Sequence, residues 1–233
     1  MNTVPTNSFA QAAQNDTNNN ISPPIPHLAF ATHNVRSFTN IAKQNFLIDL
    51  YSSLDIDVIG LQETNFTQSH IKPFNLTFNS QFHGFFGTPL QASSQTTGYG
   101  VGLLLKQNLA NHIFRHEIIL NRIIVVDLQF AKKQKMRIIN AYIPPADANA
   151  KKTIHSIIFD QIKLAVSNNY HIILLGDFNA NMDKPQLATW DKNFFNTIQN
   201  LHLFDSFTLK FDQLRTNYPT FKSYNSTSQI NYI

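Results

Sequence analysis

Cysteine is absent from the 233-residue sequence. Its absence excludes disulfide bonds, zinc sites built on thiolates, and any mechanism that uses a cysteine nucleophile. A metal ion bound by this chain must instead be held by carboxylate, amide or imidazole groups. Because carboxylate and amide oxygens favour magnesium, calcium or manganese, the composition already narrows the choice of metal.

Long hydrophobic runs are missing too. No uninterrupted apolar segment approaches the roughly 20 residues that a membrane-spanning helix needs. Residues 1–20 are polar and have neither the basic start nor the apolar middle of a secretory signal. We therefore expect a soluble intracellular protein without a membrane partner. Its hydrophobic content of 42% is enough for the core of one large α/β domain.

Charged residues are scarce, at 14% of the chain, and the formal net charge is +4. Such a balance gives a mild attraction toward polyanions and not a surface that coats nucleic acid. The densest basic run comprises Lys132, Lys133, Lys135 and Arg137 and lies between two strand-like stretches. A solvated hairpin turn is the favoured interpretation of this run, and contact with phosphate is the alternative.

The first 26 residues differ in composition from the rest. They are rich in Asn, Gln, Thr, Ser and Pro, and they end with the run Pro23-Pro24-Ile25-Pro26. A segment of this kind has too few apolar side chains to form a core. The sequence therefore predicts a disordered tail at residues 1–26, followed by one folded domain at residues 27–233.

Two similar units of strand, helix and strand lie within this domain. In the first unit, strands are predicted at residues 27–35 and 57–62, and the helix between them begins near a cap at Ser37 or Thr39. Its predicted apolar face consists of Ile41, Leu47, Leu50, Tyr51 and Leu54. In the second unit, strands at 136–143 and 171–175 flank a helix at 151–167. The apolar positions of that helix are Ile154, Ile158, Ile162 and Ala165.

Further strands are predicted at residues 81–86, 99–105, 112–120, 122–130, 220–224 and 229–233, and a further helix near 191–201. Apolar strands covered by helices on both sides favour a layered α/β domain. In such domains, polar groups at the carboxyl ends of strands are where ligands bind.

Two acids occupy strand ends of this kind. Glu63 ends the strand at 57–62, and Asp177 follows the strand at 171–175 in the turn Gly176-Asp177-Phe178-Asn179. The glycine allows a sharp turn, so that Asp177 and Asn179 can face one site. Taken singly, a glutamate that reaches solvent and an Asx-type turn are simpler explanations of the two motifs.

Taken together, the motifs resemble those of the endonuclease/exonuclease/phosphatase superfamily, whose members include deoxyribonuclease-I-like nucleases. The motifs are, in chain order, Asn34 within Thr32-His33-Asn34-Val35-Arg36-Ser37, then Leu61-Gln62-Glu63-Thr64, Asn140-Ala141-Tyr142-Ile143-Pro144-Pro145, Gly176-Asp177-Phe178-Asn179 and Ser228-Gln229-Ile230-Asn231-Tyr232-Ile233. They agree in order and spacing across roughly residues 27–233. The third and fifth motifs look most like the apurinic-type endonuclease domains of non-LTR retrotransposons. The resemblance implies a four-layered α/β sandwich, with two β-sheets packed together and helices outside, that lacks its C-terminal strand.

The resemblance also implies roles for the matched residues. Glu63 would be the main ligand of a Mg²⁺ ion, with Mn²⁺ possible in its place, and Asn34 would lie beside it in the metal site. Asp177 would orient or deprotonate the attacking water. Asn179 and Tyr142 would donate hydrogen bonds to the phosphate. The substrate would be DNA, cut to a 3′-hydroxyl and a 5′-phosphate by a monomeric, nuclear enzyme.

Two features depart from the family pattern. Active members resembling this chain carry Asp where it has Asn231, and that Asp holds a histidine from a final Ser-Asp-His element. The sequence ends at Ile233, before any such element. We therefore expect a C-terminally truncated domain of low or no activity. A catalytically dead nucleic-acid-binding remnant and a phosphatase of the same superfamily are the alternatives.

Overall fold

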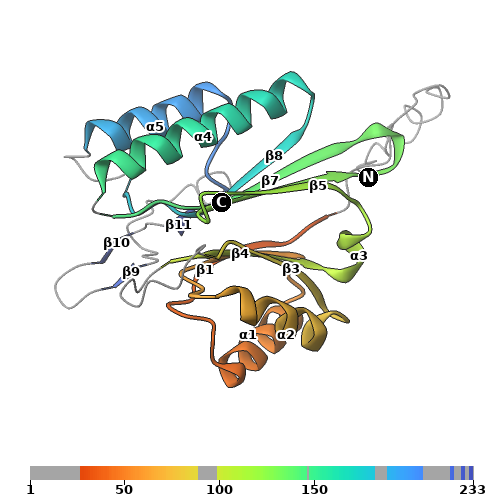
Figure 1. Cartoon of the computed structure of the whole chain (residues 1–233). Helices are drawn as coiled ribbons and strands as arrows, with labels where there is room; N and C mark the ends of the chain where they lie inside the picture. Colours follow the sequence, from red (N-terminus) through yellow and green to blue (C-terminus); the bar gives the residue numbers. More distant parts are fainter. Residues whose placement is uncertain are drawn as a thin grey trace, which may run out of the picture.

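The structure of the chain is a computed structural model. It describes residues 27–88, 99–145, 147–181 and 188–206, together with the backbone of three two-residue strands near the C-terminus. The tail predicted at residues 1–26 lies outside the described residues. Two β-sheets pack against each other, and helices cover their outer faces (Figure 1).

The first sheet has the strand order β1-β2-β4-β3. Its strands are β1 (Phe30–Asn34), β2 (Val58–Gln62), β3 (Phe82–Phe86) and β4 (Val101–Lys106). β1 and β2 are parallel, whereas β4 pairs antiparallel with both β2 and β3. Helices α1 (Ile41–Ser53) and α2 (Gln68–Phe78) cover the outer face of this sheet, below it in Figure 1.

The second sheet has the strand order β11-β8-β7-β6-β5. Its strands are β5 (Ile113–Ile119), β6 (Ile123–Gln129), β7 (Lys135–Tyr142), β8 (His171–Asp177) and β11 (Asn231–Tyr232). β7 and β8 are the parallel pair, and the other neighbours are antiparallel. Helices α4 (Ala148–Ser167) and α5 (Thr189–Asn200) cover the outer face.

The remaining elements are short. They are helix α3 (Gln107–Ala110), the 3-10 turn η1 (Ala131–Lys133) and the paired strands β9 (Phe221–Lys222) and β10 (Thr227–Ser228). None of the described helices combines the length and the apolar character that crossing a membrane would require.

Three apolar layers hold the four structural layers together. Side chains alternate between the two faces of each strand, so that Ile138 packs between the sheets whereas its neighbour Ile139 packs under α4. The third layer joins the first sheet to α1 and α2 and contains the buried ring of Phe74. This arrangement confirms the four-layered α/β sandwich predicted from the sequence.

Helix α1 forms where it was predicted, but its buried face differs from the prediction. The buried residues are Gln44, Leu47, Ile48 and Tyr51, whereas the predicted Ile41, Leu50 and Leu54 are exposed. The spacing of 44, 47, 48 and 51 is a regular helical stripe that includes one glutamine, which donates to the carbonyl of Phe38. The predicted cap is wrong as well, because Asn40 and not Ser37 or Thr39 accepts the hydrogen bond from the Lys43 N–H.

Helix α2 was not predicted from the sequence, and it contains Pro73 within its span. Proline removes one backbone hydrogen bond inside a helix. Burial of Phe74 and Phe78 against the first sheet offsets that cost. By contrast, all four apolar positions predicted for the helix at 151–167 are buried in α4.

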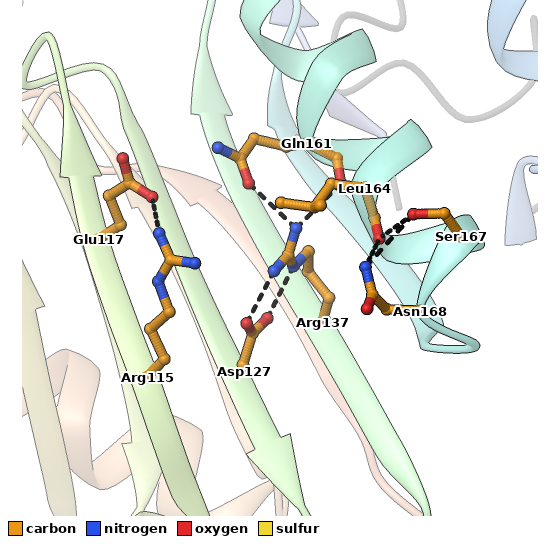
Figure 2. Close-up of polar contacts among 8 residues, drawn as sticks. All are labelled: Arg115, Glu117, Asp127, Arg137, Gln161, Leu164, Ser167 and Asn168. Atoms are coloured by element: carbon orange, nitrogen blue, oxygen red, sulfur yellow. Dashed lines mark hydrogen bonds and ion pairs between the residues drawn. The ribbon is translucent and has the colours of Figure 1, made fainter.

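The basic run between β6 and β7 separates into two environments. Lys132 and Lys133 are exposed in the turn η1, in agreement with the predicted solvated turn. For Arg137 that prediction is wrong. Its guanidinium is buried and forms two hydrogen bonds of 2.7 Å with Asp127, and it also donates to Gln161 of α4 (Figure 2). Arg137 and Asp127 are direct cross-strand neighbours, and a buried charge needs such a partner.

Candidate active site

The candidate active site lies where the two parallel strand pairs end. In the first sheet, Asn34 is the last residue of β1 and aligns with Gln62, the residue before Glu63. In the second sheet, Tyr142 ends β7 and aligns with Asp177 at the end of β8. Because the sheets pack face to face, the side chains of Asn34, Glu63, Tyr142 and Asp177 meet between them.

Asn34 connects the two acids directly. Its side-chain nitrogen Nδ2 donates to Glu63 Oε1 over 3.0 Å and to Asp177 Oδ2 over 2.9 Å. The hydroxyl of Tyr142 donates to the same Glu63 oxygen over 3.1 Å. Residues that are up to 143 positions apart in the chain therefore form one hydrogen-bonded cluster that bridges the sheets. In this arrangement Asn34 presents its amide nitrogen to the acids, and its oxygen accepts from the Arg36 N–H.

The carboxylate of Asp177 sits in an environment that disfavours its charge. The residue is 1% exposed. Burial raises the pKa of Asp177, and the neighbouring charge of Glu63 raises it further, while hydrogen bonds from Asn34 and from the Asn179 N–H oppose the shift. Burial together with Glu63 also raises the pKa of Tyr142. The tyrosine therefore stays protonated and able to donate.

The backbone around the cluster is held in rare conformations. Glu63, Asn65 and Asn179 have φ angles of 54°, 54° and 46°, in the left-handed region that costs non-glycine residues free energy. Backbone bonds from Ser37 N to Glu63 O and from Phe38 N to Thr64 O fix the loop after β2 against the loop after β1. Strain of this kind, kept in place by neighbouring hydrogen bonds, is typical of functional sites.

The other two predicted site residues lie beside Asp177. Asn179 donates from Nδ2 to the carbonyl of Ile143 over 2.9 Å, which ties the turn after β8 to the end of β7. An amide nitrogen carries two hydrogens, so one remains for another acceptor. Asn231 of β11 aligns with Asp177 in the antiparallel pairing of β11 with β8. The structure therefore places all six predicted residues at one end of the two-sheet interface.

Arg122 is a site residue that the motifs did not indicate. Its guanidinium lies over the ring of Tyr142, 5.2 Å from the centroid. Its Nη1 is buried and has no hydrogen-bond partner among the described residues. In the sequence, an arginine at the start of an apolar strand is indistinguishable from one that reaches solvent. A buried donor beside Tyr142 is suited to an incoming anion.

The donor set fits a hard divalent cation. Neither Glu63 nor Asp177 forms an ion pair with lysine or arginine within the described part of the chain. Across the described ranges no group of three or more His, Asp and Glu side chains is placed to hold a metal. Magnesium needs no such group, because it binds through one or two carboxylates and keeps several waters. Two nearby acids, one of them buried without a cationic partner, match that requirement.

Known proteins share this architecture. Residues 31–231 match the family described as Endonuclease/Exonuclease/phosphatase family. No curated protein matches the sequence. Among solved structures, the 3′ phosphatase NExo from Neisseria bound to product DNA hairpin is similar with 16% identity and a TM-score of 0.66, over 88% of this chain and 85% of that chain.

Two further structures agree. The AP endonuclease LMAP from Leishmania major has 14% identity and a TM-score of 0.66, over 88% of this chain and 78% of that chain. The catalytic domain of APE2 from Xenopus laevis has 17% identity and a TM-score of 0.63, over 87% of this chain and 80% of that chain. At these identities the likeness shows the fold. The family match begins within β1 and ends within β11, so it includes every predicted site residue, and the chain belongs to the endonuclease/exonuclease/phosphatase family.

Proposed function

We propose that the chain hydrolyses phosphodiester bonds in DNA with the help of bound Mg²⁺, for which Mn²⁺ can substitute. The observation that supports this most strongly is the convergence of Glu63 and Asp177 on the amide of Asn34, within 3.0 Å of both acids. Each acid comes from a different sheet, and neither has a cationic partner among the described residues. Held by Glu63 near a bound phosphate, a divalent cation would offset the charge that develops on the leaving oxygen.

The residues of the chain would activate the attacking water and hold the phosphate. Asp177 would take the proton of the attacking water, and its raised pKa makes it a better base near neutral pH than an exposed aspartate. The water oxygen would form a new bond to phosphorus while the bond to the 3′ oxygen breaks, which leaves a 3′-hydroxyl and a 5′-phosphate. The free hydrogen of Asn179 and the Nη1 of Arg122 would donate to the phosphate oxygens, and the Tyr142 hydroxyl would do so after turning away from Glu63.

DNA is the proposed substrate for two reasons. The similar structures include a 3′ phosphatase bound to product DNA and an AP endonuclease from Leishmania major. The motifs around Tyr142 and Asn231 resemble those of non-LTR retrotransposon endonucleases, which favours an origin in a mobile element and action in the nucleus.

The test compares the wild-type chain with Glu63→Gln and Asp177→Asn in nicking of supercoiled plasmid with Mg²⁺. Loss of Asp177 should reduce turnover by about 10²–10⁴-fold, the usual contribution of a general base. EDTA should abolish wild-type nicking. Wild-type and variant proteins that nick equally well, or nicking that survives EDTA, would contradict the proposal.

Asn231 supports a second candidate, a domain that binds nucleic acid without cutting it. It aligns with Asp177 in the β8–β11 pairing, where an amide cannot stabilise a cation as a carboxylate does. The same plasmid assay separates the candidates, since binding without nicking supports this one. Release of phosphate from a 3′-phosphorylated oligonucleotide would indicate phosphatase activity instead.

A further inference from the structure

A second polar layer lies behind the candidate active site, inside the interface between the sheets. Gln62 of β2 and Asn140 of β7 are both fully buried there. Gln62 Nε2 donates to Asn140 Oδ1 over 2.8 Å, which joins one sheet to the other. Asn140 Nδ2 donates in turn to the carbonyls of Leu61 and Gly102, over 3.2 Å and 2.7 Å. We call the side chains of Gln62 and Asn140 the amide bridge.

The amide bridge is in register with the site. Tyr142 lies two residues beyond Asn140 on β7, so both side chains lie on the face that meets the first sheet. Gln62 directly precedes Glu63. Thr32, two residues before Asn34 on β1, is bonded to Gln62 at 3.1 Å. Each residue of the second layer therefore belongs to a strand that also carries a site residue or leads directly into one.

The backbone of β2 is shaped to receive the bridge. A Cβ atom added to Gly60 would lie 2.6 Å from Asn140 Oδ1 and 1.8 Å from Leu175 Cδ1, which is closer than real contacts allow. Because Gly60 has no side chain, the amide of Asn140 reaches the backbone of the opposite sheet. Both hydrogens of Asn140 Nδ2 are donated, and Asn140 Oδ1 accepts one hydrogen bond. The buried amide of Asn140 therefore leaves no donor without a partner.

Stability alone does not account for this arrangement. Replacing both partners of a buried hydrogen bond by apolar groups of the same shape is often nearly neutral, and the surrounding inter-sheet contacts are apolar. Apolar contacts have no preferred direction, whereas hydrogen bonds fix distance and angle. A directional link between the sheets is useful where side chains from both sheets must meet within about 0.5 Å of a required geometry.

We propose that the amide bridge positions Glu63 relative to Tyr142 and Asp177, and so sets the affinity of the site for its divalent cation. Gln62 and Asn140 are positioning residues, since neither contacts the phosphate in the proposed mechanism. This inference rests on the proposed function. Its effect is expected in metal binding and in kcat, and not in the KM for DNA, because both side chains of the bridge are fully buried and cannot contact DNA.

The experiment measures Mn²⁺ binding by electron paramagnetic resonance, thermal unfolding of the metal-free protein, and nicking kinetics. Asn140→Leu and Gln62→Met remove the bridge while roughly keeping side-chain size. Each should weaken Mn²⁺ binding by about 10–100-fold, as loss of groups that orient metal ligands commonly does. The double variant should bind Mn²⁺ no more weakly than the more affected single variant, because either change breaks the same link.

Leu128→Ala is the matched control. Leu128 is fully buried in the same inter-sheet layer but aligns with Met136, six residues before Tyr142. It should lower the unfolding temperature and leave Mn²⁺ affinity unchanged. If Asn140→Leu does not fold, Thr32→Val removes only the hydroxyl bonded to Gln62 and should shift Mn²⁺ affinity in the same direction by a smaller factor.

The outcomes separate the two hypotheses. A wild-type chain that binds no Mn²⁺ overturns the proposed function, and with it the role of the bridge. A wild-type chain that binds Mn²⁺ while the bridge variants bind it equally tightly overturns only the positioning role. The positioning role is also overturned if Leu128→Ala weakens Mn²⁺ binding as much as Asn140→Leu does.

Discussion

Two aspartates of the second sheet are almost equally buried, yet the chain treats their charges in opposite ways. Asp127 on β6 is 2% exposed and Asp177 on β8 is 1% exposed. Asp127 receives two hydrogen bonds of 2.7 Å from Arg137, which also contacts α4 (Figure 2). Asp177 receives hydrogen bonds only from the neutral groups of Asn34 and Asn179 among the described residues, and its charged neighbour is another acid, Glu63.

The pKa shifts express this difference. Pairing with Asp127 raises the pKa of Arg137, which keeps the guanidinium charged. Burial and Glu63 raise the pKa of Asp177, which disfavours its ionised form. The chain thus neutralises one buried acid with its own cation, and under the proposed function it leaves the other beside a site for a cation from solution. We call Asp127 and Arg137 the closed pair, and we call Glu63 and Asp177 the open pair. A closed pair stabilises the fold, whereas an open pair is suited to binding a cation.

The largest expected effect comes from opening the closed pair. Arg137→Met should destabilise the protein by about 3–5 kcal/mol, because it leaves Asp127 buried and without its counter-charge. Urea denaturation monitored by circular dichroism measures the change. The matched control is Arg115→Met in strand β5, which pairs with β6. Arg115 forms a similar 2.8 Å bond with Glu117, but both side chains are exposed. Its loss should cost less than about 1 kcal/mol. Equal losses for the two variants would contradict the distinction between closed and exposed pairs.

The second largest effect is expected when Mg²⁺ binds at the open pair. Mg²⁺ at about 100 times its dissociation constant should raise the free energy of unfolding by about 2.7 kcal/mol. Thermal unfolding with and without Mg²⁺ measures it. Glu63→Gln should abolish the increase, because Glu63 is the proposed Mg²⁺ ligand, and should stabilise the metal-free protein, since a neutral amide avoids the repulsion from Asp177. Arg115→Met, which leaves the site untouched, should keep the full Mg²⁺ effect. Stabilisation by Mg²⁺ that persists in Glu63→Gln would place the ion elsewhere.

Sequence reasoning found the open pair more easily than the closed one. Glu63 and Asp177 end apolar strands, and a charge at such a position stands out within a short motif. Arg137 stands beside three lysines, and only the antiparallel pairing of β6 with β7 aligns it with Asp127. Local patterns therefore mark residues at strand ends, whereas partners inside a sheet depend on register, which a single sequence does not specify.

The amide bridge and Arg122 were missed for a related reason. Gln62 and Asn140 lie within family motifs, but their contact crosses between the sheets and joins residues that are 78 positions apart in the chain. Gly60, which makes room for Asn140, looks in the sequence like any glycine in a strand. The strands were predictable because hydrophobic periodicity is local, and the four layers followed from the resemblance of the motifs to the family. The packing of one sheet face on the other is not local.

The smallest expected effect is the contribution of His155 to the pH dependence of stability. This histidine lies beside a third buried acid, Asp191. Asp191 of α5 pairs with Lys151 of α4 at 3.3 Å, and His155 lies beside them, stacked on Phe194 at a centroid distance of 4.1 Å. Burial lowers the pKa of His155 from 6.5 to about 4. Between these values the unfolded chain binds a proton that the folded chain does not. Stability should therefore fall as the pH falls through this window.

The expected loss from this histidine is about 1 kcal/mol between pH 7.5 and pH 5, after allowance for screening by solvent. His155→Phe keeps a stacked ring at this position and does not titrate. The raised pKa of Asp177 acts in the opposite sense, since its protonation favours the folded state as the pH falls. That contribution is common to both proteins, so the difference between their urea denaturation midpoints isolates His155. The wild type should lose stability relative to His155→Phe at pH 5. A difference between the two proteins that stays constant with pH would contradict this prediction. It would show that the imidazole titrates normally and that its charged form is tolerated in the contact between α4 and α5.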